Sequence, residues 1–253
     1  MHKTEEFISS ILRRKRHCVF ISPHLDDVAL SCAALIQQLS GKTPITIVNV
    51  FTAADTQPYT FSARKFLSQS GKFFDALQVF EERVREDQKV LNQFKVTVVN
   101  LGLVDALFRK RSARSSLGRF IPEINHLYPT YRWHILNSIN PHDSALQQLE
   151  SALQRWNNSR TVVFAPYGIG NHVDHQLARQ VCQQVFSEVV LYSDFPYNIR
   201  TQSYGTPIKR NQEVRIQPKF EWKKKLLQGY QTQFAGLFEN GELPVHEEVY
   251  FET

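Results

Sequence analysis

The sequence predicts an α/β fold, a Rossmann-like doubly wound and mostly parallel sheet flanked by helices. Two observations predict it. Short runs rich in β-branched residues alternate with longer amphipathic stretches, which is the pattern of βαβ units with right-handed crossovers. The short runs are also nearly continuous in apolar residues, as expected of strands buried on both faces of a parallel sheet.

This alternation predicts the following elements. The strands are expected at His17–Ser22, Ile45–Phe51, Val96–Leu101, Thr161–Ala165 and Val189–Ser193. The helices are expected at Val28–Leu39, Phe73–Phe94, Ala145–Trp156, His172–Phe186 and Glu221–Phe234. We expect the 253 residues (1–253) to form a single domain.

Two segments interrupt the alternation. Residues 103–143, from Leu103 to Asp143, contain arginine and serine clusters, three prolines and several aromatic residues. Because so long a segment without regular structure is often functional, we interpret it as an insertion after the third strand that serves as a lid. Asn198–Gln217 is a second polar connection.

The composition excludes several classes of protein. With 42% hydrophobic and 21% charged residues, the chain is neither disordered nor fibrous. Its three cysteines include no CxxC pair, which argues against a disulfide framework and favours a reducing compartment. No apolar run approaches the roughly 18 residues of a membrane span, and the N-terminal stretch lacks the apolar region of a signal peptide. We therefore expect a cytoplasmic protein.

The charge is moderately basic, with 30 Lys and Arg against 24 Asp and Glu and a net charge of +6. Basic residues gather at Arg13–Arg16 and again between Arg109 and Arg119. No RNP, zinc-finger or helix-turn-helix pattern accompanies them, which argues against nucleic-acid binding. A solvated surface or an anionic substrate or partner explains the clusters better.

A first polar motif follows the first strand. That strand runs directly into Ser22–Asp27 (SPHLDD), and a helical pattern begins at Val28. Ligands of open α/β sheets bind outside the carboxyl ends of the strands, so His24, Asp26 and Asp27 would lie at the binding edge and could form half of a metal site. The alternative is an Asp that caps the helix, which would explain one carboxylate but neither the other nor the histidine.

A second polar motif follows the fourth strand. A glycine-containing turn leads into Asn171–His175 (NHVDH), where two histidines straddle Asp174 at the start of a helix. Residues three apart on a helix share a face, so His172 and His175 would both reach into one cleft. The parallel sheet brings this motif to the same edge as the first one.

Together the motifs supply three ligands for one metal ion, namely His24, Asp27 and His175. A catalytic zinc site holds three protein ligands and leaves a fourth position open for water. Such a site predicts metal-assisted hydrolysis of an amide or an ester.

The remaining polar residues of the motifs fit roles in that chemistry. Asp26 would be the general base for the water, and His172 the general acid or the donor to the oxyanion. Asp174 would orient the imidazole of His172, as a carboxylate behind a catalytic histidine does.

The pair of motifs resembles the PIG-L/LmbE family of zinc-dependent de-N-acetylases, which act on N-acetylglucosamine-type conjugates. SPHLDD corresponds to the family's AHPDD motif, and residues 172–175 correspond to its HPDH motif. The resemblance implies a zinc ion, with ferrous iron as the alternative, held by His24, Asp27 and His175. It also implies that Asp26 is the base and that His172 is the catalytic histidine.

Weaker likenesses extend over most of the chain. Arg83, in the stretch RVRE, resembles the family's arginine that contacts the sugar. Asp105 resembles an aspartate that binds a sugar hydroxyl after the third strand, and Ser193–Tyr197 (SDFPY) resembles the EDxPY stretch after the fifth.

The sequence also departs from the family pattern. Leu25 replaces the usual proline, and Val28 stands where many members have glutamate. Ile169 occupies the position at which some members place a tyrosine that helps to hold the oxyanion. The resemblance therefore implies that His172 does this alone or that Tyr167 substitutes from the same loop.

The leading hypothesis is a hydrolase that removes acetyl from a small N-acetylated amino sugar or its conjugate. The alternatives are a metal-dependent esterase or amidase with a non-sugar substrate, a non-catalytic sugar- or nucleotide-binding protein, and a nucleic-acid-associated protein. Side chains of the two connecting segments, including Tyr131, Trp133, Arg109 and Arg119, would suit a glycoside with an anionic or aromatic aglycone. A homo-oligomer is compatible with the sequence.

Overall fold

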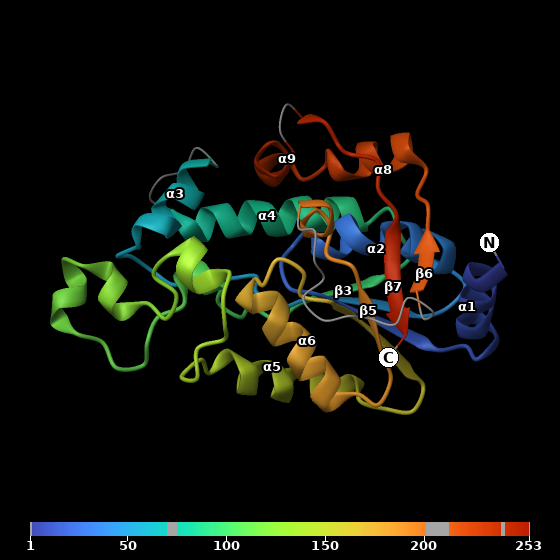
Figure 1. The fold of residues 1–253 in the computed structure, drawn as a ribbon, viewed down its shortest axis with the longest axis horizontal. Coiled ribbons are helices and arrows are strands. Elements are labelled where there is room, and N and C mark those ends of the chain that lie inside the picture. Colours follow the sequence, from blue (N-terminus) through green and yellow to red (C-terminus); the bar gives the residue numbers. More distant parts are fainter. Residues whose placement is uncertain (1, 70–74, 201–212, 239–240, 253) are drawn as a thin grey trace.

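The central sheet is mixed and mostly parallel. The computed structural model describes residues 2–69, 75–200, 213–238 and 241–252, and within them the sheet has seven strands in the order β3-β2-β1-β4-β5-β7-β6 (Figure 1). These strands are β1 (His17–Ser22), β2 (Ile45–Asn49), β3 (Thr97–Asn100), β4 (Thr161–Pro166), β5 (Val189–Tyr192), β6 (Glu213–Ile216) and β7 (Glu248–Glu252). The first five run parallel to one another, β7 runs antiparallel to β5, and β6 runs antiparallel to β7. The predicted fold class and the five predicted strands are confirmed.

The order of the strands creates a crevice at one edge of the sheet. From β1 the chain proceeds outward through β2 and β3, and it then returns to place β4 on the other side of β1. Cys18 of β1 is accordingly paired with Ile45 on one side and with Val162 on the other. Ligands of doubly wound sheets bind at this switch point, which lies between the carboxyl ends of β1 and β4.

Four of the five predicted helices are confirmed as single helices: α2 (Asp27–Leu39), α4 (Ala76–Leu91), α5 (Ala145–Leu153), which continues as the 3₁₀ turn η5 (Gln154–Trp156), and α6 (Val173–Val185). The predicted start of the second, at residues 73 and 74, lies outside the described residues. The last predicted helix is two helices, α8 (Phe220–Leu227) and α9 (Gln231–Leu237). They are separated at Gly229, where a Cβ atom would lie 2.5 Å from a methyl group of Val90, because the chain approaches α4 closely there.

Helices cover both faces of the sheet. In Figure 1, α5 and α6 lie below the sheet and α2, α4 and α8 lie above it. The lower layer includes Leu149 and Leu177 packed against Val19 and Val163 of the strands, whereas Phe20 of β1 faces the opposite layer. This arrangement buries both faces of the parallel strands, which is why these strands are nearly continuous in apolar residues.

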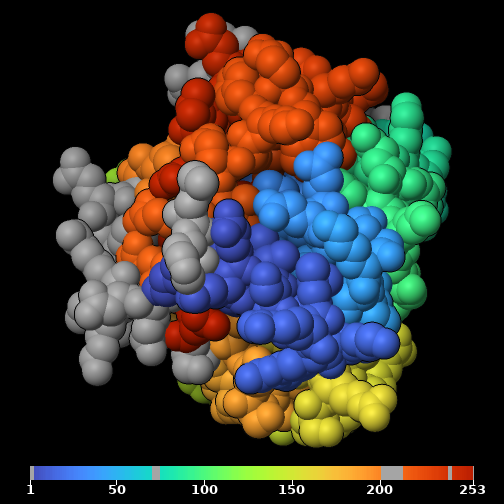
Figure 2. Space-filling model, turned by 90° about the vertical axis from the view of Figure 1, so that its right-hand side faces the viewer, coloured from blue at the N-terminus to red at the C-terminus, as the bar shows by residue number. Residues whose placement is uncertain are grey.

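The sequence prediction missed α1 (His2–Arg13), α3 (Phe61–Gln69), the short α7 (Tyr197–Arg200) and the two antiparallel strands. Helix α1 buries Phe7 and Ile11 against the sheet. Figure 2, a view onto the right-hand side of Figure 1, shows α1 lying across that side of the molecule beside α2. Strand β6 alternates buried and exposed residues, so its polar half resembles a loop in the sequence. The prediction of a polar connection at Asn198–Gln217 is therefore wrong at β6, and residues 201–212 lie outside the described residues.

Strand β7 is also tied to the middle of α2. The carboxylate of Glu248 accepts hydrogen bonds from the backbone N–H groups of Ala34 (2.8 Å) and Leu35 (3.2 Å). It pairs at 2.5 Å with Nζ of Lys223, which comes from α8. A charge buried this completely needs such partners, so three elements are held together around one carboxylate.

All of residues 103–143 are described, and they form short turns rather than long helices or strands. The turns are η1 (Ala106–Phe108), η2 (Ser116–Arg119) and η3 (Pro122–Asn125), which are 3₁₀ helices, and η4 (Tyr131–Ile135), a π-helical turn. Phe108, Tyr128 and Ile135 pack with α3 and α4 in a separate apolar cluster. The predicted irregular segment after the third strand is therefore present, with its inner part packed against the two helices.

Candidate metal centre and active site

The first motif forms a tight loop between β1 and α2. The hydroxyl of Ser22 donates a hydrogen bond to the carbonyl of His24 (2.6 Å) and accepts one from the N–H of Val28 (3.1 Å). Oδ2 of Asp27 accepts from the N–H of His24 (2.7 Å). Asp26 precedes the helix but its side chain makes no capping hydrogen bond. The capping explanation for this carboxylate is therefore wrong, because Ser22 satisfies the N–H at the helix start.

The second motif begins with a turn that depends on glycine. Gly168 and Gly170 have φ values of 84° and 86°, and Asn171 has a φ of 60°. A Cβ atom on Gly170 would lie 2.7 Å from the ring of Tyr197, so only glycine fits. The turn leads into α6, whose first residues are held by His172, since Nδ1 of this ring accepts from the N–H of Asp174 (3.3 Å).

The three expected ligands meet at the switch point of the sheet. Oδ2 of Asp27 lies 3.1 Å from Nδ1 of His24 and 3.3 Å from Nε2 of His175. One donor atom from each residue lies within 4.8 Å of the others. Nε2 of His175 is buried and makes no hydrogen bond with any described residue. A metal ion would satisfy this nitrogen, and two imidazoles with one carboxylate are a donor set that zinc accepts. The residues fit a metal.

A second ring of carboxylates holds the two imidazoles. Oδ1 of Asp194 lies 2.6 Å from Nδ1 of His175, and Oδ2 accepts from the backbone N–H groups of Gly168 and Ile169. Oδ2 of Asp174 lies 3.3 Å from Nε2 of His24. Such partners fix the orientation of metal-binding histidines. The sequence analysis gave Asp194 no role, although its place directly after β5 puts it at the same edge of the sheet.

Asp174 has a different role from the one expected. Its carboxylate contacts His24 and the N–H of Ala106 (3.0 Å), and it pairs with Arg109 at 2.5 Å. The prediction that this carboxylate orients His172 is therefore corrected: the hydrogen bond from Asp174 to that ring comes from its backbone N–H, while its carboxylate oxygens bond to other groups. Burial would raise the pKa of Asp174, but Arg109 and the neighbouring histidines outweigh burial and hold it below the usual range.

Arg109 itself is not available to a substrate. The guanidinium is buried, pairs with both Asp174 and Asp143, and stacks 4.7 Å from the ring centre of Phe51. It also donates to the carbonyl oxygen of Val104 (2.9 Å). The expectation that Arg109 faces an aglycone is wrong, because the buried carboxylates need its charge.

Asp26 and His172 both line a cavity beside the ligand set. Oδ1 of Asp26 lies 4.0 Å from a guanidinium nitrogen of Arg83. Burial and the charge of Asp27 raise the pKa of Asp26 to about 6, which makes it a stronger base than an ordinary carboxylate. Burial and the nearby histidines lower the pKa of His172. The two side chains thus combine a proton acceptor with a neutral imidazole.

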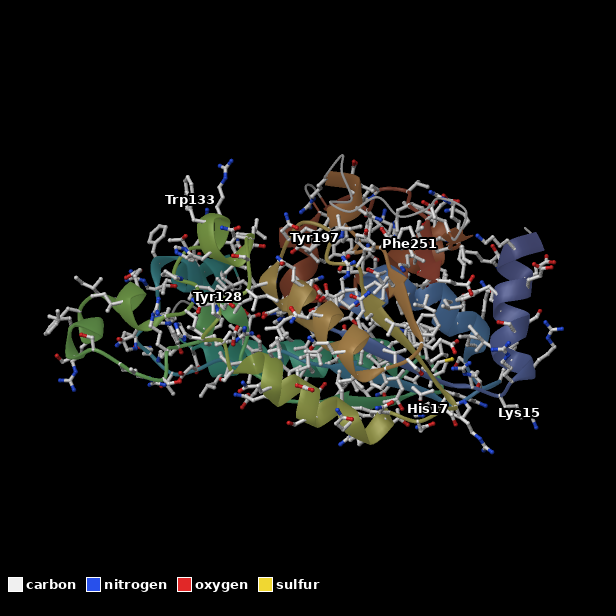
Figure 3. The ribbon with its side chains drawn as sticks, turned by 60° about the horizontal axis from the view of Figure 1, so that its bottom comes forward. Lys15, His17, Tyr128, Trp133, Tyr197 and Phe251 are labelled. Carbon is white, nitrogen blue, oxygen red and sulfur yellow. The ribbon has the colours of Figure 1, made fainter. Side chains whose placement is uncertain are left out.

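The cavity has a volume of about 1170 Å³ and is bordered by the first motif and by α3, α4, η4, α7 and α9. Arg83 and Asp105, the predicted sugar contacts, line it, as do Tyr131 and Trp133 of η4. Arg119 is exposed and is not among the lining residues, so the expectation that it faces an aglycone is wrong. Figure 3 shows Trp133 pointing outward, at the opposite end of the molecule from His17, where β1 begins. The cavity therefore lies at the carboxyl edge of the sheet, as predicted.

Two tyrosines other than Tyr167 lie close to the histidines. Tyr167 is not among the residues that line the cavity, and its ring packs against Phe251 (5.4 Å between centres) and under the guanidinium of Arg179. The ring of Tyr131 lies 6.2 Å from that of His172, and the ring of Tyr197 lies 5.7 Å from that of His175. The structure thus separates Tyr167 from the polar cluster, because its ring is part of the lower core layer.

Comparisons with known proteins agree with this architecture. The chain is 27% identical over 242 residues to 2'-N-acetylparomamine deacetylase of Niallia circulans, an alignment that covers 88% of this chain and 83% of that protein. Among solved structures, the zinc-inhibited form of teicoplanin deacetylase is similar with a TM-score of 0.71 at 20% identity, covering 93% of this chain and 97% of that chain. N,N'-diacetylchitobiose deacetylase from Pyrococcus horikoshii has a TM-score of 0.56 at 11% identity, with 99% and 90% covered.

The family assignment rests on the part of the chain that carries the site. The sequence profile described as PIG-L, GlcNAc-PI de-N-acetylase, matches residues 19–186. This range includes both motifs, all three expected ligands and, apart from the first two residues of β1, the strands β1 to β4 that position them. With this match and the site geometry, the chain belongs to the PIG-L family.

Proposed function

We propose that the protein is a metal-dependent hydrolase that removes the acetyl group from an N-acetylated amino sugar or from a conjugate of one. The observation that carries the proposal is the His24, Asp27 and His175 set, whose donor atoms converge beside a large cavity. Asp26 and His172 line the same cavity. A binding protein would need neither a base nor an acid there, so the whole arrangement favours hydrolysis.

The chain's own residues account for the proton transfers. Zinc is the proposed metal, with ferrous iron as the alternative, and a metal held here supplies Lewis-acid chemistry to a carbonyl and a water. Asp26 would take the proton of that water, and His172 would deliver a proton to the leaving amine or a hydrogen bond to the oxyanion. Asp194 and Asp174 keep the two ligating imidazoles in position.

The cavity supports a substrate larger than one sugar. Its volume of about 1170 Å³ exceeds the roughly 300–1,000 Å³ of typical small-molecule sites. Arg83 and Asp105 would bind the hydroxyl groups of the sugar, while Tyr131 and Trp133 would contact the rest of a conjugate. The relative from Niallia circulans is named 2'-N-acetylparomamine deacetylase, and an N-acetylated substrate of that kind supports the proposed substrate class.

We also propose that the chain is one domain and that it works in the cytoplasm. Cys18, Cys32 and Cys182 are buried and unpaired, which supports a reducing compartment. Among the described helices, none has the length and apolar character needed to cross a membrane.

The test is acetate release from N-acetylglucosamine, its methyl glycoside and 2'-N-acetylparomamine by the purified, zinc-loaded protein. We expect turnover that a chelator abolishes and added zinc restores. Asp26→Asn should abolish turnover and keep the metal, while the surface variant Glu81→Gln should match the wild type. Full activity of Asp26→Asn would contradict the assigned base, and a protein that binds no metal would contradict the whole proposal.

A further inference from the structure

A loop at residues 110–126, called the tip below, projects from the end of the molecule farthest from α1 (Figure 1, light green). It exposes four large apolar side chains: Leu117 (61%), Phe120 (83%), Ile121 (52%) and Ile124 (40%). All four lie within residues 117–124, a stretch that includes most of the turns η2 and η3. Exposed apolar groups that occur singly are ordinary, but a cluster of this kind marks an interaction surface.

The loop is built to present these side chains. Its ends are joined by a β-bridge between Lys110 and His126. The side chain of Asn125 accepts from the N–H of Ser115 (2.8 Å) and donates to the carbonyl of the same residue (3.0 Å). Gly118 packs directly against this amide. The side-chain amide of Asn125 is thus hydrogen-bonded within the loop, while the four apolar side chains are exposed to solvent.

The surroundings of the apolar cluster are positively charged. Arg111, Arg114 and Arg119 are all exposed. The single acidic residue of the tip, Glu123, accepts a hydrogen bond from the N–H of Phe61 (2.9 Å) and so faces α3. Asp55 lies 3.3 Å from Arg114 but belongs to another segment. The tip therefore combines exposed apolar groups with an excess of positive charge.

We propose that the tip docks the protein onto an anionic lipid surface. The apolar side chains of Leu117, Phe120, Ile121 and Ile124 would enter the boundary between headgroups and acyl chains, where amphipathic segments bind. The three arginines would contact the lipid phosphates, and each basic residue near such a surface raises binding about fivefold. This peripheral docking goes beyond hydrolysis and does not depend on the proposed activity.

Other occupants fit the tip less well. A stable protein interface buries about 800 Å² on each partner, whereas four side chains on a projecting loop offer a small convex surface. A second copy of the chain would bring Arg111, Arg114 and Arg119 of both copies together, and like charges oppose such contact. A soft anionic surface accommodates both the shape and the charge.

The N-terminal basic cluster provides an internal comparison. Arg13, Arg14 and Lys15 are exposed, as the arginines of the tip are. The apolar residues of the same helix, Phe7 and Ile11, are instead buried against the sheet. This cluster has the charge of the tip without its exposed apolar groups.

The test is co-sedimentation of the full chain with vesicles of phosphatidylcholine alone or of equimolar phosphatidylcholine and phosphatidylglycerol. We expect binding only to the anionic vesicles, with weakening at high salt. Phe120→Ser with Ile121→Ser, and separately Arg111→Gln with Arg114→Gln and Arg119→Gln, should each reduce binding at least about tenfold. The matched triple variant Arg13→Gln, Arg14→Gln, Lys15→Gln removes the same charge and should bind as the wild type does.

Acetate release from a water-soluble substrate and the melting temperature should be the same in all these variants, because every substituted side chain is exposed. Wild-type protein that stays in the supernatant with anionic vesicles would overturn the proposal. So would binding that only the N-terminal triple variant loses. Sedimentation velocity gives a further outcome. A dimer of the wild type that is lost in the variant Phe120→Ser with Ile121→Ser would show that the tip serves self-association instead.

Discussion

Asp194 and His175 reach each other from different segments, with Oδ1 of the carboxylate 2.6 Å from Nδ1 of the imidazole. Asp194 follows β5, while His175 belongs to α6. The contact assigns the proton of the ring to Nδ1 and leaves Nε2 free on the side of Asp27, as a metal ligand requires. The carboxylate of Asp194 is itself fixed by hydrogen bonds from the backbone N–H groups of Gly168 and Ile169, in the loop before α6.

Replacing Asp194 should weaken metal binding without removing a ligand. Asp194→Asn is expected to lower zinc affinity by about 10–100-fold, the usual effect of losing a carboxylate behind a metal-binding histidine. Competition with a chromogenic chelator measures this affinity. Asp55→Asn, at a half-buried carboxylate that pairs with Lys110 and Arg114 and contacts no expected ligand, is the control and should leave the affinity unchanged. An unaltered affinity in Asp194→Asn would show that His175 needs no such support.

Replacing His172 should reduce turnover and preserve the metal. Its Nδ1 accepts from the backbone, so the proton of the neutral ring resides on Nε2. We expect His172→Gln to lower kcat by about 10²–10⁴, as for loss of a general acid. The exposed His142→Gln is the matched control. Wild-type kcat in His172→Gln, with metal content measured on the same sample, would exclude a catalytic role for this ring.

Replacing Arg109 should reduce stability. Arg109→Gln would leave Asp143 and Asp174 buried without their cation, which typically costs about 3–5 kcal/mol. Urea unfolding at neutral pH measures the free energy of unfolding. Arg119→Gln, a change at an exposed arginine, should shift it by no more than about 0.5 kcal/mol. A small effect of Arg109→Gln would mean that the two carboxylates find other partners.

The titration of Asp87 should make the stability of the protein depend on pH. This carboxyl accepts from Asn49 (2.7 Å) and Tyr230 (2.7 Å), and burial raises its pKa to about 7. Because the folded pKa is above the unfolded one, the unfolded state loses its proton first. Asp87 therefore lowers stability as the pH rises from about 4 to about 7, by up to about 1.4 kcal/mol per pH unit.

The variant Asp87→Asn removes this titration. The variant's free energy of unfolding minus that of the wild type should therefore increase as the pH rises from about 4 to about 7, and this difference should stay constant at higher pH. Urea unfolding at several pH values gives the comparison. A difference between the two proteins that is independent of pH would contradict the raised pKa.

The sequence was sufficient for the parallel part of the fold and for the grouping of the site. Strands buried on both faces show as apolar runs, and parallel strands bring the ends of β1 and β4 to one edge whatever their separation in sequence. For this reason the sequence alone predicts that His24, Asp27 and His175 lie together. Strand β6 could not be found in this way, because an exposed antiparallel edge has no continuous apolar signal.

Contacts between side chains were harder to predict than positions along the chain. Asp174 is next to two histidines in sequence, but which imidazole its carboxylate meets depends on where Arg109 and Ala106 approach it. Tyr167 lies in the expected loop, yet its side chain turns toward Phe251 instead of the cavity. Local sequence gives no information about either choice, since both are decided by segments distant in the chain.

The β-bridge between Lys110 and His126 holds the two ends of the tip next to each other. The residues between these ends can therefore be replaced as one segment. Replacing residues 111–125 by a short glycine-containing turn would leave both ends where they are, because the bridge already holds them side by side. Arg109 and Leu127, just outside the bridge, keep their buried contacts. Because no residue of the tip lines the cavity, the surface that the tip presents can be changed without a substitution in the ligand set or in the cavity.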